Sequence, residues 1–162
     1  MRTPTSPGNW DHRVDRKADM NDMALRGALE AHWAASDAND FDAEHRVYRD
    51  DAVLEYPQSG ERIRGRANIQ ASREAQPNKK RFTVRRITGG GELWISELVS
   101  TYDEQPFYVV SIMEFEDSEV VRETQYFGKP FAPGASRAQW VEPVGVTRTI
   151  LTDIVALLAV EA

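Results

Sequence analysis

Residues 48–65 read Tyr-Arg-Asp-Asp-Ala-Val-Leu-Glu-Tyr-Pro-Gln-Ser-Gly-Glu-Arg-Ile-Arg-Gly. Residues 52–56 contain the branched and aromatic side chains that favour β-strands, and the segment from Pro57 to Gly60 carries turn-forming residues. A second short strand-like run, Glu61–Arg64, follows directly, and Gly65 ends it. The stretch therefore predicts a β-hairpin with a longer loop.

Two helices are predicted ahead of this hairpin. The first has one face at helical spacing, made of Leu25, Leu29, His32, Trp33 and Ser36. Asn21 or Asp22 is expected to cap its start, and Asn39 to take the left-handed conformation at its end. Asp40 then caps a second, short helix that begins at Phe41.

A third helix and four strands are predicted after the hairpin. Residues Arg66 to Gln76 are good helix formers with a weak apolar stripe, so we expect a helix that faces solvent along much of its length. Four strand-like runs follow, Arg81 to Thr88, Glu92 to Tyr102, Phe107 to Glu116 and Glu119 to Phe127. The turns between these runs are short, which is typical of an antiparallel meander.

Helices that come first and strands that come last favour an α+β fold, with the helices packed on one face of a curved, mostly antiparallel sheet. The 162 residues, 41% of them hydrophobic, are enough for one buried core. We expect a mobile polar tail over residues 1–20, one domain over residues 21–142, and a helical C-terminal extension over residues 143–162.

Composition argues against several classes of function. The 26 acidic and 20 basic residues give a formal charge of -6, which repels a nucleic-acid backbone, so no nucleic-acid partner is expected. No apolar run reaches the roughly 20 residues of a membrane span, so no membrane association is expected. The absence of cysteine removes disulfides and thiolate sites and suits a cytoplasmic protein. Because neither His12 nor His45 has a histidine or carboxylate arrangement typical of a metal site, we expect no metal. We also expect no cofactor, since general acid/base catalysis needs none.

The stretch from Tyr48 to Gly65, with a helix before it and Arg66-Ala-Asn-Ile69 opening a helix after it, resembles the central signature of the SnoaL-like branch of the nuclear-transport-factor-two-like superfamily. The late segment Glu123-Thr-Gln-Tyr-Phe127 is similar to the end of the same domain. The resemblance implies a cone-shaped fold whose three N-terminal helices and sheet enclose a pocket, a small-molecule ligand, and a homodimer through the outer face of the sheet. It does not imply one activity, because the fold hosts isomerases, cyclases, dehydratases, epoxide hydrolases, binding proteins and assembly domains.

This chain lacks key catalytic residues of two well-understood enzyme classes of the superfamily, the ketosteroid isomerases and the epoxide hydrolases. Ketosteroid isomerase uses a carboxylate base, with a tyrosine and a protonated aspartic acid that donate to the oxyanion. The comparison puts His32 in place of the tyrosine, Tyr56 in place of the base and Ser111 in place of the acid. Gln125 stands where epoxide hydrolases carry an acid on the last strand, and an amide is neither an acid nor a base at neutral pH. Polyketide cyclases of the SnoaL type use aspartate and histidine in the cone, which here leaves His32 and a different carboxylate.

Strand alternation identifies the residues expected to face the pocket. With Ser111 directed inward, Tyr108, Val110 and Ile112 form an apolar outer row, which supports a dimer. On the last strand, the residues predicted to face inward are Val121, Glu123, Gln125 and Phe127. The full predicted pocket lining consists of Trp33, Tyr48, Tyr56, Trp94, Leu98, Ser111, Met113, Gln125 and Phe127.

The catalytic hypothesis joins His32 to Glu123, the one strand carboxylate predicted inside, as an acid/base pair. Burial would lower the pKa of the histidine and raise that of the glutamate, which brings both towards neutrality. The chain would then be a cofactor-independent isomerase, cyclase or hydratase that acts on a small apolar or cyclic molecule. Two alternatives stay open: a non-catalytic ligand-binding or dimeric interaction domain, and a core histidine bonded to a buried glutamate without any chemistry.

Overall fold

The computed structural model describes residues 12–144, with side chains from residue 21 onward. The described residues form two units: the first ends at Pro130, and the second, which is short, begins at Phe131. The first unit contains the helices α1 (His12–Ala38), α2 (Phe41–His45) and α3 (Arg66–Glu74). Its strands are β1 (Tyr48–Tyr56), β2 (Glu61–Arg64), β3 (Lys80–Gly90), β4 (Leu93–Tyr102), β5 (Gln105–Glu116) and β6 (Glu119–Gly128). The second unit contains the 3-10 helix η1 (Ala135–Trp140).

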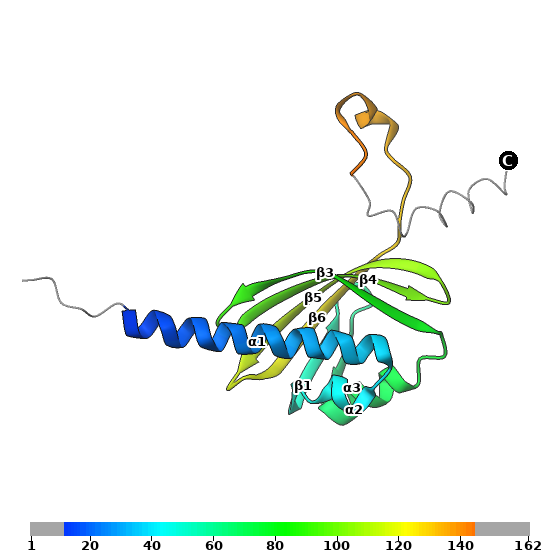
Figure 1. The fold of residues 1–162 in the computed structure, drawn as a ribbon. Helices are drawn as coiled ribbons and strands as arrows, with labels where there is room; N and C mark the ends of the chain where they lie inside the picture. The colour runs from blue at the N-terminus through cyan, green and yellow to red at the C-terminus, as the bar shows by residue number, and fades with distance from the viewer. Residues whose placement is uncertain (1–11, 145–162) are drawn as a thin grey trace, which may run out of the picture. The chain divides into compact units, whose positions relative to one another are not determined.

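The strands form one six-stranded sheet in the order β2-β1-β6-β5-β4-β3. Neighbouring strands run antiparallel except β1 and β6, which are parallel. Figure 1 shows the curvature of the sheet, with α1 lying against it and with α2 and α3 beside β1. The prediction of an α+β fold with helices packed on a curved, mostly antiparallel sheet is confirmed.

The core lies between α1 and the sheet. Leu25, Leu29 and Trp33, which share the predicted face of α1, are each at most 3% exposed. They belong to one buried cluster with strand residues such as Leu54 and Leu98. Burial of a leucine-sized side chain contributes about 1.5–3 kcal/mol, so this face holds the helix on the sheet.

α1 begins at His12, earlier than the predicted caps Asn21 and Asp22. Residues 12–20 contain neither glycine nor proline, so nothing in them ends a helix. Asp22 Oδ1 instead accepts a hydrogen bond of 2.8 Å from the backbone N–H of Gly91, which ties α1 to the turn after β3. The other end follows the prediction: Asn39 has a φ of 56°, and Asp40 Oδ1 accepts a hydrogen bond of 3.0 Å from the backbone N–H of Ala43.

α3 has one inward face that the sequence analysis did not identify. Much of the helix is exposed, as predicted, but Ile69 is fully buried. Arg73 follows Ile69 by one helical turn, so its side chain points in the same direction and is only 13% exposed. The weak apolar stripe therefore carries an inward-facing charged residue.

The central strands alternate between buried and exposed residues as predicted. On β5, Ser111 and Met113 are buried whereas Tyr108 and Val110 are exposed. The prediction for Val121 on β6 was wrong, because the register between β5 and β6 shifts between Glu114 and Phe115. Val121 is the extra residue of that bulge, and its neighbour Val120 takes the buried position opposite Phe115.

The C-terminal extension predicted for residues 143–162 falls mainly outside the described residues. Within residues 131–144, η1 is a short 3-10 helix with no buried residue. Among the helices that the structure describes, none is long and apolar enough to span a membrane.

Candidate functional site

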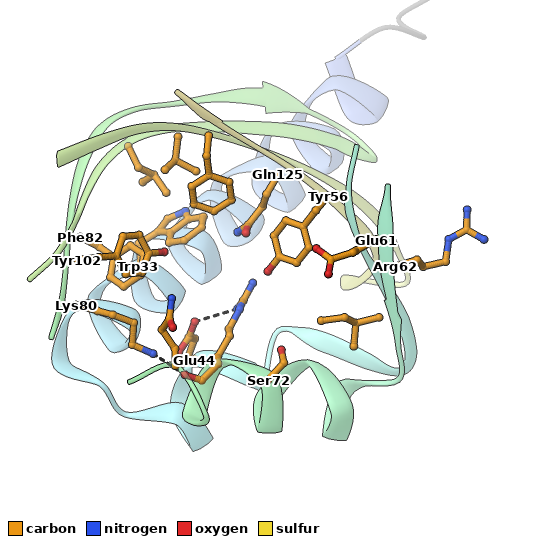
Figure 2. A pocket seen from close by; sticks show the side chains of 16 residues that line it. Trp33, Glu44, Tyr56, Glu61, Arg62, Ser72, Lys80, Phe82, Tyr102 and Gln125 are labelled. Carbon is orange, nitrogen blue, oxygen red and sulfur yellow. Dashed lines mark hydrogen bonds and ion pairs between the residues drawn. The ribbon is translucent and has the colours of Figure 1, made fainter. Parts of the chain in front are cut away.

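The first unit contains a cavity of about 630 Å³ between the helices and the concave sheet (Figure 2). Five of the predicted pocket residues line it, namely Trp33, Tyr56, Leu98, Gln125 and Phe127. Phe82 and Val109 add further apolar surface. Charged and polar side chains line the rest of the wall, among them Glu44, Glu61, Arg62, Arg73 and Lys80. The cavity therefore combines an aromatic and aliphatic surface with several polar groups, and concave sites that combine apolar surface with polar groups commonly bind ligands.

The other four predicted pocket residues do not line this cavity. Tyr48, Trp94, Ser111 and Met113 are at most 4% exposed and lie in the packed interior. The indole Nε1 of Trp94 donates a hydrogen bond of 3.1 Å to the carbonyl of Gly91. Tyr48 and Ser111 instead direct their hydroxyl groups to Glu123.

Glu123 is fully buried, as strand alternation predicted, and both of its oxygens are occupied. Oε2 accepts hydrogen bonds from the Tyr48 hydroxyl at 2.5 Å and from Arg73 Nη2 at 2.8 Å. Oε1 accepts hydrogen bonds from the Ser111 hydroxyl at 2.6 Å and from Gln125 Nε2 at 2.7 Å. Burial alone would raise the pKa of Glu123, but the Arg73 charge and these donors outweigh it and lower the pKa. The residue is therefore a stable buried anion.

Arg73 joins two buried carboxylates. Its Nη1 lies 2.9 Å from Oε1 of Glu44, and its Nη2 lies 2.8 Å from Oε2 of Glu123. Nη2 also donates to the Tyr48 hydroxyl at 3.1 Å. A guanidinium can serve several acceptors at once because its donors form a planar fork. Glu44, Arg73 and Glu123 thus form a continuous chain of charges from α2 through α3 to β6, which we call the buried ion chain.

His32 is buried and contacts the main chain of Glu44. Its Nδ1 lies 2.7 Å from the Glu44 carbonyl, so Nδ1 carries the proton that is donated. Its Nε2 is buried and has no hydrogen-bond partner among the residues that the structure describes. Burial, with the nearby Arg73 charge, lowers the pKa of His32 to about 4, so the ring is neutral at pH 7. No hydrogen bond joins His32 to Glu123 directly.

The cavity wall also holds polar groups that the sequence analysis missed. Lys80 is 8% exposed, and its Nζ donates to the Arg73 carbonyl at 2.7 Å and lies 4.6 Å from the centre of the Phe41 ring. Burial raises the pKa of Tyr56 to about 12, so its hydroxyl keeps its proton and remains a donor. In Figure 2 the side chains of Tyr56, Gln125 and Glu44 point into the cavity.

The sequence gives little indication that Glu44, Arg73 and Lys80 face the cavity. Each is a charged residue on a short helix or at a strand end, where a surface position is the usual outcome. Only the spacing of Arg73 from Ile69 hints at an inward direction. Among the described residues, no group of three or more His, Asp or Glu side chains is placed to hold a metal ion.

Comparison with known proteins agrees with this architecture. The model of the SnoaL-like domain matches residues 29–123. An NTF-2 like protein of unknown function from Burkholderia xenovorans LB400 is 53% identical in a match that covers 79% of this chain and 98% of that one, with a TM-score of 0.73. No protein with a curated function matches the chain.

Two more distant solved structures share the fold. An LEH-like epoxide hydrolase of M. tuberculosis is 23% identical over 66% of this chain and 80% of its own, with a TM-score of 0.58. TerC, co-crystallised with polyporic acid, is 15% identical over 64% of this chain and 91% of its own, with a TM-score of 0.56. At such identities the likeness is one of fold.

Proposed function

This chain belongs to the SnoaL-like domain family, and we propose that it binds a small apolar or cyclic molecule in its cavity and acts on it by general acid/base catalysis without a cofactor. The reaction class is that of an isomerase, cyclase or hydratase. The observation that carries the proposal is an aromatic-lined cavity of about 630 Å³ whose wall includes members of the buried ion chain.

The apolar part of the wall favours a flat or cyclic ligand. Trp33, Phe82 and Phe127 supply aromatic surfaces, and Leu98 and Val109 supply aliphatic ones. The co-crystallisation of TerC, a protein of the same fold, with polyporic acid supports a ligand of this kind. Such surfaces bind by excluding water, while the polar groups of the wall orient the ligand.

The polar part of the wall supports proton transfer. Arg73 and Lys80 are cations, Glu44 is a carboxylate, and Tyr56 is a neutral donor, all on the same cavity. Charged and hydrogen-bonding groups that are held in place beside a bound ligand stabilise a charge that develops on it. Isomerisation, cyclisation and hydration all need a proton to be moved while charge develops on the ligand.

His32 and Glu123, the residues of the catalytic hypothesis, do not line the cavity but each contacts a residue that does. His32 binds the main chain of Glu44, and Glu123 binds the guanidinium of Arg73. With four donors on Glu123, a hydrogen bond would have to break before that carboxylate could take up a proton from a ligand. We propose that both residues serve the reaction through the groups that they hold.

We further propose a homodimer formed through the outer face of the sheet. Tyr108, Val110 and Tyr126 are 46%, 36% and 41% exposed on that face, and Val110 pairs with Tyr126 across β5 and β6. An exposed apolar row of this kind gains stability when a second copy covers it. A cytoplasmic location, based on the absence of cysteine, remains a prediction.

Native mass spectrometry of the protein as purified tests the proposed function. A bound small molecule should appear as a mass above that of the chain and should be released on denaturation. Its isolated mass and fragmentation then identify the compound, and turnover of that compound by the purified protein distinguishes catalysis from binding. Binding without turnover would contradict the catalytic part of the proposal.

A further inference from the structure

We infer that Glu44 is the group in the cavity that accepts the proton, with Arg73, His32 and Glu123 as its positioning residues. The inference deepens the proposed function and rests on it. It starts from the unequal surroundings of the two carboxylates at the ends of the buried ion chain.

The carboxylates of Glu44 and Glu123 differ in whether an oxygen is free to contact a ligand. Glu123 has two donors on each oxygen and does not line the cavity. Glu44 does line the cavity, and its Oε1 accepts a hydrogen bond from Arg73 at 2.9 Å. No hydrogen bond to its Oε2 is found among the described residues, and this oxygen is not one of the fully buried unpartnered atoms. Figure 2 shows the carboxylate of Glu44 directed into the cavity. A ligand can therefore reach a free carboxylate oxygen at Glu44 and at no comparable place on Glu123.

Glu44 is also held from two sides. His32 Nδ1 donates to its carbonyl at 2.7 Å, and Arg73 Nη1 binds its side chain. Arg73 in turn is fixed by Glu123, itself fully buried. A base held in one position loses little freedom when it meets its substrate, so this arrangement favours the reaction over mere binding. His32 and Glu123 then have the same role, which is to hold Glu44 in position, His32 directly and Glu123 through Arg73.

The proton transfer balances without a further reactant. Oε2 of Glu44 forms a bond to a proton from a C–H or O–H group of the ligand, and the electron pair of the broken bond stays on the ligand. The carboxylate becomes a neutral carboxylic acid, while the ligand becomes an enolate or alkoxide. Arg73 and Lys80 are the cavity cations that stabilise this anion. Glu44 returns the proton at a second position, which completes an isomerisation or a ring closure.

A carboxyl-directed label tests the inference without knowledge of the substrate. The full-length protein is treated with 4-nitrophenyl glycidyl ether and mapped by peptide mass spectrometry. A carboxylate oxygen attacks the terminal epoxide carbon, the carbon–oxygen bond of the ring opens, and the alkoxide takes a proton from water. The expected product is an ester on Glu44, and this label should be lost in Glu44→Gln. It should persist in Glu61→Gln, which removes an exposed carboxylate of the same cavity.

Fluorescence titration with 2-naphthol on the same samples separates the two proposals. Binding of naphthol together with an ester on Glu44 supports both. Naphthol binding with no ester on Glu44, or with the ester on Glu123, overturns the assignment of Glu44 and leaves the ligand-binding cavity intact. Absence of naphthol binding counts against the cavity as a site for cyclic ligands, while an ester on Glu44 in that case still supports its free oxygen.

Discussion

Arg73 of α3 and Glu123 of β6 lie 50 residues apart in the sequence and form an ion pair of 2.8 Å, with the carboxylate fully buried. The pair connects the helix after the hairpin to the last strand of the sheet. It also explains how a carboxylate can be buried in the core at all, because its charge is matched by a cation and by three further donors. The candidate site therefore depends on the docking of α3.

Substitution of Arg73 by methionine should destabilise the protein strongly. Glu44 and Glu123 would lose their common partner, and removal of one partner of a buried ion pair costs about 3–5 kcal/mol. Urea unfolding at pH 7 measures the loss. As a control, Arg62→Met removes an arginine that is 50% exposed and pairs with Glu55, for which about 0–1 kcal/mol is expected. Equal losses in the two variants would show that the buried ion chain does not stabilise the fold.

His32 should make stability depend on pH between about 6.5 and 4. Burial, with the Arg73 charge, lowers its folded pKa from 6.5 to about 4, so the unfolded chain binds the proton first as the pH falls. Acid therefore favours unfolding in this window, by about 3 kcal/mol from this group. Well above pH 6.5 His32 is neutral in both the folded and the unfolded chain, so this residue no longer lowers the stability.

Urea unfolding of the wild type and of His32→Asn at several pH values checks this prediction. Burial also lowers the pKa of His45, so the variant should keep part of the pH dependence and lose the part that belongs to His32. Parallel pH profiles for the two proteins would mean that His32 titrates normally in the folded state.

Filling the cavity should abolish ligand binding. Val109 is 3% exposed and lines the cavity, whereas its neighbour Val110 is 36% exposed on the other face of β5. We expect Val109→Trp to lose binding of 2-naphthol and Val110→Trp to retain it. Naphthol fluorescence measures binding, and circular dichroism confirms that both variants are folded. Retained binding in folded Val109→Trp would place the naphthol site elsewhere.

The outer face of the sheet should hold two copies of the chain together. Light scattering at micromolar concentration is expected to give the mass of a dimer for the wild type and of a monomer for Tyr126→Glu, because the new charge would be buried in the interface. Met23→Glu, at a position on α1 that is 74% exposed, is the control and should remain dimeric. A monomeric wild type would exclude the proposed dimer.

The features predicted correctly from the sequence are those with a local cause. Asn39 and Asp40 were identified because helix ends have their own residue preferences. Strand alternation placed Glu123 in the interior, where it is fully buried. The sheet itself was predictable because short turns join its long strands.

The features that the sequence did not reveal depend on contacts between distant elements. Val121 was misplaced because a bulge arises from the pairing of two strands and leaves no mark on one of them. Arg73 and Glu44 look like surface residues within their own helices. Only the packing of α3 against β1, and of α2 against α1 and α3, turns their side chains inward. The partners of a charged residue are thus harder to predict than the direction of a strand residue.

A crystal structure of the protein soaked with 2-naphthol or cyclohexanone tests the central claim, that the cavity is a site for small cyclic molecules. We predict the probe in the cavity, with its ring against Trp33 and Phe82 and its oxygen within hydrogen-bonding distance of Arg73, Lys80 or Tyr56. A cavity that contains only water at saturating probe concentration, or that is closed by the protein's own side chains, would contradict the account.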